Sequence, residues 1–225
     1  MSAPFLNREE AGRALAARLL KMHFSQPVVV LALPRGGVPI AAIVARALGA
    51  PLDLLMVRKI GVPWQPELAL AAVVDGDHPE IVIDDEVANH VETDHDYIEK
   101  QARVELREIE RRRQVYLKGR AALEVEGRTA IVVDDGIATG TTVRAALKAL
   151  RRRNPARLVL AVPVAPGDTL AALRSEVDDI VCLSQPFPFY AIGEHYADFH
   201  QVSDDEVLAA LASAADAEHP GPGDS

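Results

Sequence analysis

Two adjacent carboxylates, Asp134 and Asp135, separate an apolar run from a loop rich in glycine and threonine. The run over 129–133 has the β-branched residues of a buried strand, and the loop over 136–142 leads into a helical pattern. Open α/β sheets hold ligands at the carboxyl ends of their strands, and a helix N-terminus flanked by glycine and hydroxyl groups binds an anion. A pentose 5-phosphate fits this pattern, because its hydroxyls would donate to the carboxylates while its phosphate occupies the loop.

Apolar strands alternate with helical segments along most of the chain. This order predicts an α/β fold with a parallel sheet and helices on both faces. Asn7 followed by Glu10 predicts the start of the first helix, and the charged segment over 86–120 has the spacing of a long amphipathic helix. Glycine and proline predict a loop over 58–66. We expect strands over 28–33, 52–57, 68–74, 80–83, 129–135, 157–164 and 178–183, and further helices over 40–48, 142–153 and 168–175.

Composition excludes several classes of protein. A formal net charge of −9 over 225 residues argues against a general nucleic-acid binder or a membrane-surface binder. Cys182 is the only cysteine, so an internal disulfide and a cysteine metal cluster are both impossible. The first residues lack the apolar run of a signal peptide, and no stretch is long and apolar enough to span a bilayer. We therefore expect a cytoplasmic protein.

The stretch Ile131–Thr142, IVVDDGIATGTT, resembles the binding motif for phosphoribosyl diphosphate (PRPP) of type I phosphoribosyltransferases. The resemblance implies that Asp134 and Asp135 hold the ribose hydroxyls and contribute to Mg²⁺ binding through the ribose or through water. It implies a 5-phosphate site in the residues that follow, which are Gly136, Ile137, Ala138, Thr139, Gly140, Thr141 and Thr142. The alternative is a strand that ends in a polar turn without a ligand.

Two further motifs match the same family. The segment Leu33–Gly37, LPRGG, resembles its diphosphate loop, although PRGG alone is also compatible with a plain turn. Val57–Lys59 ends a predicted strand where the family places cations near the diphosphate, with a surface pair as the alternative, and 60–67 would be a mobile flap. These motifs add Arg35, Gly36, Gly37, Arg58 and Lys59 to the implied PRPP site. The implied catalytic residues are Arg35, Lys59, Asp134 and Asp135.

Five of the ten aromatic residues lie within 187–199. We expect a hood in which the rings of Phe187, Phe189 and Tyr190 stack on a planar acceptor. A small lid packed on the core or on a dimer partner is the alternative. Ala138 stands where relatives that use 6-oxopurines carry an aspartate, which implies little activity with hypoxanthine, guanine or xanthine.

The whole chain resembles a group of bacterial phosphoribosyltransferases with LPRGGVP, VRK, VVDDG and AIG-x-x-Y-x-DF segments. We expect one domain over 1–215, with a core over 28–183 and a hood over 184–203, and the resemblance covers most of residues 28–200. The charged pattern predicts a helical insertion over 86–120, and composition predicts a disordered tail over 216–225. The implied activity is Mg²⁺-dependent transfer of a 5-phosphoribosyl group from PRPP to an unidentified nitrogenous acceptor, and we expect a homodimer. A non-catalytic regulator that binds PRPP or a nucleotide is the alternative.

Overall fold

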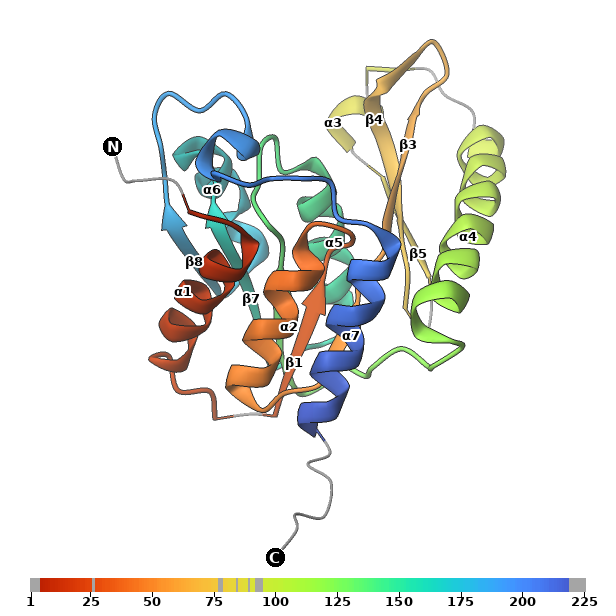
Figure 1. Ribbon diagram of the computed structural model, residues 1–225. Helices are drawn as coiled ribbons and strands as arrows, with labels where there is room; N and C mark the ends of the chain where they lie inside the picture. The colour runs from red at the N-terminus through yellow and green to blue at the C-terminus, as the bar shows by residue number, and fades with distance from the viewer. Residues whose placement is uncertain are drawn as a thin grey trace, which may run out of the picture.

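The computed structural model describes residues 5–25, 27–76, 79–83, 85–88, 90–91 and 95–218, and it confirms the α/β fold (Figure 1). A central parallel sheet has the strand order β2-β1-β6-β7-β8. Short apolar runs form these strands because both of their faces are buried. The strands are β2 (Leu52–Leu54), β1 (Val28–Ala32), β6 (Thr129–Val133), β7 (Arg157–Val164) and β8 (Asp179–Ser184).

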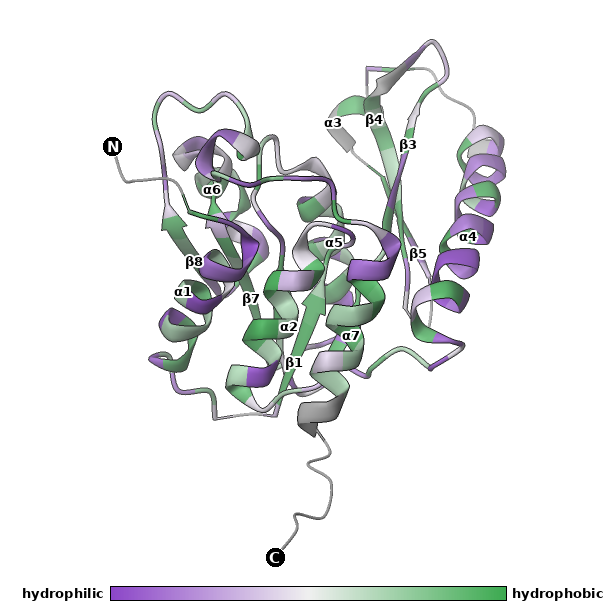
Figure 2. Ribbon diagram, viewed as in Figure 1, coloured by the Kyte–Doolittle hydropathy of each residue, from purple (hydrophilic) through white to green (hydrophobic). Residues whose placement is uncertain are grey.

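Helices cover both faces of the central sheet (Figure 1). One layer contains α1 (Arg8–Leu20), α2 (Gly37–Leu48) and α7 (Asp204–Glu218), and the other contains α5 (Thr141–Arg152) and α6 (Gly167–Leu173), which continues into the 3₁₀ turn η1 (Arg174–Glu176). Successive strand residues alternate between the two layers: Val30 packs on the first and Leu31 on the second. Strand β1 is apolar throughout, and β7 is apolar after its first residue, Arg157 (Figure 2).

The expected start of the first helix is confirmed. The Asn7 side chain accepts a hydrogen bond from the Glu10 amide at 3.0 Å. The Glu10 carboxylate accepts from the Leu6 amide at 2.6 Å, one residue earlier than in the usual capping box. Both bonds satisfy amide donors that a helix end leaves without an internal partner.

A second, antiparallel sheet consists of β3 (Val57–Val62), β4 (Gln65–Val74) and β5 (Glu80–Ile83). The pairing of 68–74 with 80–83 is confirmed, but the prediction of a loop over 58–66 is wrong. Residues in this segment form β3 and the start of β4, and register shifts around Gly61 accommodate the irregular sequence. The predicted strand over 52–57 is also divided, since β2 ends at Leu54 and β3 begins at Val57.

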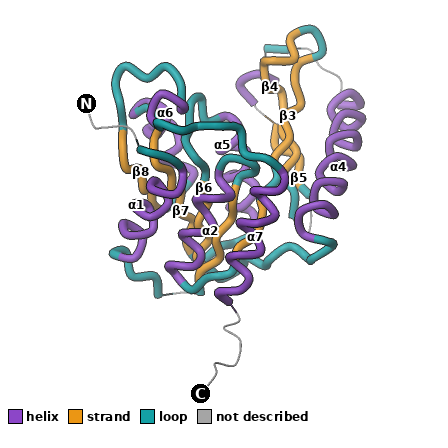
Figure 3. The backbone as a smooth tube through the Cα atoms, in the orientation of Figure 1, coloured by secondary structure: helices purple, strands orange, loops and turns teal. Residues whose placement is uncertain are grey.

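The charged segment forms α3 (Asp85–Ala88) and α4 (His95–Leu117), and α4 lies along the antiparallel sheet with a largely hydrophilic surface (Figure 2). Helix α7 was not expected from the sequence. It runs to Glu218, so the expected tail begins inside a helix, and 219–225 lie outside the described residues. Figure 3 shows that the loop before α7 crosses the molecule near the N-terminal end of α2. This loop includes the 3₁₀ turn η2 (Ile192–His195).

Candidate active site

Two loops that are about a hundred residues apart in sequence meet at the carboxyl ends of β1 and β6. These strands are neighbours, and the Leu33 amide donates to the Val133 carbonyl at 3.0 Å just beyond them. A Cβ atom on Gly36 would lie 2.1 Å from Oδ2 of Asp135, and one on Gly37 would lie 2.6 Å from the Val133 carbonyl oxygen. Glycine is therefore required at both positions for this close packing. The Pro34–Arg35 peptide bond in the same loop is cis.

The loop after Asp135 has the form of an anion cradle. Gly140 occupies the N-cap position of α5 at a φ of 76°, and no side chain caps this helix end. The amides of the first helical turn have no intrahelical partner, so they are available to a ligand. Two bonds fix the loop from the neighbouring strand and helix: the Ile137 amide donates to the Val164 carbonyl at 2.9 Å, and Thr169 Oγ1 donates to the Ala138 carbonyl at 2.8 Å.

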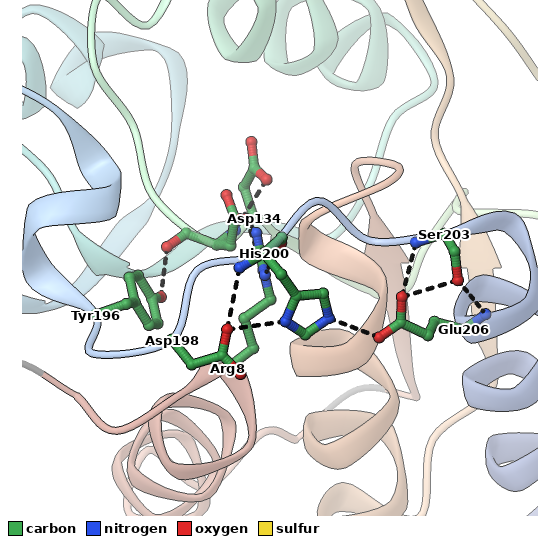
Figure 4. A network of polar contacts seen from close by, with 8 residues as sticks. Arg8, Asp134, Tyr196, Asp198, His200, Ser203 and Glu206 are labelled. Carbon is green, nitrogen blue, oxygen red and sulfur yellow. Dashed lines mark hydrogen bonds and ion pairs between the residues drawn. The ribbon is translucent and has the colours of Figure 1, made fainter.

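The two carboxylates are enclosed to different degrees. Asp135 is buried and Asp134 is half-buried, and the Asp135 amide donates to Asp134 Oδ1 at 2.8 Å. Burial raises the pKa of both groups, and repulsion from Asp135 raises the pKa of Asp134 further. Arg8 opposes the shift at Asp135, because its Nε and Nη2 atoms lie 2.9 and 2.8 Å from Oδ2 (Figure 4).

Lys59 and Arg58 are directed to different places. Lys59 lines a pocket of about 90 Å³ together with Thr139, Thr141 and Thr142 of the cradle. Arg58 forms an ion pair with Glu105 of α4, with Nε and Oε2 2.7 Å apart. Adjacent side chains of a strand point to opposite faces, which explains the separation. The structure therefore brings Lys59, and not Arg58, to the cradle.

Arg35 lies at the N-terminal end of α2 and faces the start of α7. Its Nη1 atom is 3.5 Å from Oδ1 of Asp204, and the same carboxylate oxygen accepts a 2.6 Å hydrogen bond from the Tyr116 hydroxyl. Its side chain is one-third exposed, so this ion pair is screened by water and contributes little to stability. Arg35 can exchange Asp204 for an anionic ligand at low cost.

The family model described as "Phosphoribosyl transferase domain" matches residues 5–198. This chain belongs to that family. Two relatives from strains of Mycobacterium tuberculosis, both named "Putative phosphoribosyl transferase", are 45% identical over 210 residues. The alignments cover 93% of this chain and 47% of each relative, so the chain spans about half their length. The crystal structure of TT1426 from Thermus thermophilus is 39% identical, with a TM-score of 0.81 over 92% of this chain and 97% of the other.

The aromatic rings of 187–199 divide between exposed and packed positions. Phe187 and Tyr190 are exposed, at 98% and 75%, and line a pocket of about 790 Å³ with Ala138, Asp168 and Gln185. The other three rings form stacked pairs: Phe189 with His195, and Tyr196 with Phe199. Tyr196 also donates to the Asp135 carbonyl at 2.6 Å. The two exposed rings and Phe189 therefore border the pocket beside the cradle, while Tyr196 and Phe199 pack within the segment that holds them.

The two carboxylates of the site, Asp134 and Asp135, fit Mg²⁺ only if a bound ligand supplies further oxygen atoms. Within the described ranges, no group of three His, Cys, Asp or Glu side chains is arranged to hold a metal ion. Asp134 and Asp135 provide two carboxylates, and Mg²⁺ commonly takes its remaining oxygens from a substrate phosphate and water.

The helices of the described chain are all too short or too polar to cross a membrane.

Sequence reasoning missed four residues that complete the site: Arg8, Tyr196, Thr169 and Asp204. Tyr196 belongs to the AIG-x-x-Y-x-DF segment but had been assigned no contact with the site, and the other three belong to no motif. Each reaches the site through a contact distant in sequence. Charge balance offered one clue, because two adjacent buried carboxylates require a cation nearby.

Proposed function

We propose that this chain transfers a 5-phosphoribosyl group from PRPP to a nitrogen atom of a small acceptor. The observation that carries the proposal is the convergence of the Gly36–Gly37 loop, the Asp134–Asp135 pair and the cradle at the start of α5. A ribose between the carboxylates and the cradle would place its anomeric carbon toward the Arg35 loop. In the reaction the bond from this carbon to the diphosphate oxygen breaks, and a bond to the acceptor nitrogen forms.

Each side chain has a role that follows from its place. The diphosphate leaves with the bonding electrons, so the cations Arg35 and Lys59 would stabilise the departing charge. Asp134 and Asp135 would accept hydrogen bonds from the ribose hydroxyls and stabilise the positive charge that develops on the ring. Mg²⁺, when bound, would neutralise part of the diphosphate charge. The acceptor nitrogen loses a proton as its bond forms.

The pocket of about 790 Å³ beside Ala138 is the proposed acceptor site. Phe187 and Tyr190 offer exposed ring faces for a planar heterocycle, and Asp168 and Gln185 offer polar groups on the same wall. An ionised carboxylate accepts hydrogen bonds and donates none, so Asp168 favours an acceptor edge with amino or N–H groups. The proposal includes a cytoplasmic homodimer, and sedimentation of the purified protein would test its dimeric state.

Titration calorimetry with PRPP and Mg²⁺, followed by assays of diphosphate release with a panel of bases, tests the proposal. Binding together with base-dependent release supports catalysis. Binding without release from any base would favour a regulator that recognises PRPP. Absence of PRPP binding would contradict the proposed function.

A further inference from the structure

The pocket that Lys59 shares with the threonines of the cradle also contains two cations of α5, Arg144 and Lys148. Strands β4 and β5 supply an apolar wall of alanine, valine and isoleucine side chains. The volume of about 90 Å³ is well below the roughly 300–1,000 Å³ of a pocket that encloses a drug-sized molecule. A pocket with cations, hydroxyl groups and this volume suits a compact anion rather than a heterocyclic base.

Arg144 and Lys148, the pocket cations, are an unfavourable pair for the helix that carries them. They are four residues apart, so they lie on one face of α5, and like charges at this spacing destabilise a helix. The first turn of α5 contains no acidic residue, and the positive end of the helix dipole disfavours cations near it. Both residues are half-buried, which limits the screening of their repulsion by water. Helix stability therefore does not account for the pocket cations.

The arginines in the last turn of α5 differ from the pocket cations in having carboxylate partners. Nη1 of Arg151 lies 3.1 Å from Oδ2 of Asp178, and Nη1 of Arg152 lies 3.1 Å from Oε2 of Glu80. In the part of the chain that the structure describes, neither pocket cation forms an ion pair with an acidic side chain. Arginine and lysine are the side chains with which proteins bind phosphate groups. The pocket cations therefore favour an anionic ligand, which would offset their repulsion.

The pocket cations form a row that begins beside the cradle. The Arg144 amide donates to the Gly140 carbonyl at 2.8 Å, so Arg144 lies one turn after the N-cap residue of α5. Lys148 lies one turn further, about 6 Å along the helix axis. Long helical side chains lean toward the N-terminus of their helix, which for α5 is the end at the cradle. A second phosphate beside the one expected in the cradle would therefore meet both cations.

We propose that this pocket is a second phosphate-binding site, in which Arg144 and Lys148 bind a phosphate group next to the cradle. The phosphate is either inorganic phosphate or the second phosphate of a nucleoside 5-diphosphate whose first phosphate occupies the cradle. Either ligand would regulate the active site, because the bound phosphate would compete for Lys59, which lines the same pocket. The inference rests on the proposed function for the ligand of the cradle, but the role of the pocket cations can be measured without turnover.

The test uses a double variant, Arg144→Gln with Lys148→Gln, which removes both charges and keeps residues that favour a helix. Arg18→Gln with Lys100→Gln is the matched control, because these exposed cations of α1 and α4 do not line the pocket and their loss changes the net charge equally. Calorimetry at constant ionic strength measures two quantities in each protein. One is the affinity for inorganic phosphate in protein saturated with ribose 5-phosphate. The other is the ratio of the affinities for ADP and AMP.

Wild-type protein should bind inorganic phosphate in the presence of ribose 5-phosphate, bind ADP more tightly than AMP, or do both. The first result identifies the free ion as the ligand, and the second identifies the second phosphate of a nucleotide. In the double variant the phosphate affinity should fall at least about 10-fold, the scale of a lost charge-assisted hydrogen bond, and any preference for ADP should disappear. The affinity for ribose 5-phosphate should be nearly unchanged, and the control should match the wild type. If the double variant fails to fold, Lys148→Gln alone should give a smaller loss in the same direction.

A folded double variant that retains the wild-type affinity for phosphate and the wild-type preference for ADP would overturn the inference. Wild-type protein that neither binds phosphate beside ribose 5-phosphate nor prefers ADP would also overturn it. An equal loss of ribose 5-phosphate affinity in the double variant would assign both cations to the cradle itself and has the same meaning, as does an unaffected Lys148→Gln where that variant is used. Wild-type protein that binds neither PRPP nor ribose 5-phosphate would instead overturn the proposed function. Titration of inorganic phosphate alone into the wild type and the double variant would then still decide whether the pocket cations bind a phosphate.

Discussion

Replacing Gly36 with alanine should disable the proposed PRPP site through a single contact. Gly36 has an ordinary helical conformation, with φ −57° and ψ −37°, so alanine introduces no backbone strain there. The new Cβ atom would lie 2.1 Å from Oδ2 of Asp135. Relieving this overlap requires a displacement of about 1 Å, because non-bonded carbon and oxygen atoms need more than about 3 Å. Oδ2 is also the atom that Arg8 holds at 2.8 and 2.9 Å.

The displaced carboxylate has two consequences of known scale. Overpacking of a buried site costs about 1–3 kcal/mol of folding free energy. Loss of one charge-assisted hydrogen bond to the ribose would weaken PRPP binding by about 10-fold to 100-fold. Denaturant unfolding measures the first effect, and titration calorimetry with PRPP and Mg²⁺ measures the second. Gly36→Val should have larger effects than Gly36→Ala, because its branched side chain occupies more space.

Gly167→Ala is the matched control for PRPP affinity, since its Cβ atom would meet only Gln185 Oε1 at an ordinary 3.6 Å. A double-mutant cycle isolates the proposed contact. Once Asp135→Ala has removed the carboxylate, Gly36→Ala should cause little further loss of stability. Additive losses in the cycle, or a folded Gly36→Ala protein that binds PRPP as tightly as the wild type, would refute the reasoning.

Further predictions concern the carboxylates, the diphosphate loop and the acceptor. Changing Asp134 and Asp135 together to Asn should weaken binding of PRPP and ribose 5-phosphate by at least about 1–3 kcal/mol in calorimetry. A folded double variant that binds both ligands as tightly as the wild type would contradict the site assignment. Because the pKa of both groups is raised, wild-type affinity should decline on acidification well above the usual aspartate pKa of about 3.9, and a profile flat to that pH would contradict this. Arg35→Ala should harm binding of PRPP and diphosphate far more than that of ribose 5-phosphate, whereas equal losses would indicate a structural arginine. Tyr190→Ala should raise the KM for the acceptor and leave the KM for PRPP unchanged in steady-state assays. A change confined to the KM for PRPP would contradict the assignment of Tyr190 to the hood. Ala138 predicts little turnover of hypoxanthine, guanine or xanthine, and a kcat/KM of about 10⁴ M⁻¹s⁻¹ or more with any of them would show that another group replaces the missing carboxylate.

The parallel core could be predicted from the sequence because its strands are short apolar runs bounded by helix signals. The run before Asp134 and the cap at Asn7 are local patterns, and local patterns persist in the fold. The segment around Gly61 was misread for the opposite reason. Gly and Pro signal a loop locally, but pairing with β4 makes the segment a strand. If the segment had been assigned as a strand, the alternation of side chains would have predicted that Arg58 and Lys59 point to opposite faces of the sheet.

The partners of the motif residues could not be predicted in the same way. An arginine in the first turn of a helix is usually solvated, and nothing near Arg8 in sequence indicates a carboxylate that the chain reaches 127 residues later. Asp204 likewise starts a helix whose small residues give a weak amphipathic pattern. Such contacts depend on how layers pack, and packing is decided by the whole tertiary structure rather than by local spacing.

The contacts that hold Arg8 against Asp135 set an order of events during synthesis. The last strand of the central sheet ends at Ser184, so a nascent chain of that length already contains every parallel strand. The carbonyl and the ring that hold Arg8 belong to residues made afterwards, His200 and Phe199. A chain still on the ribosome can therefore acquire its sheet while Asp135 lacks a fixed counterion. Chains that stop between Ser184 and Phe199 would therefore carry both loops but lack the carbonyl and the ring that contact Arg8.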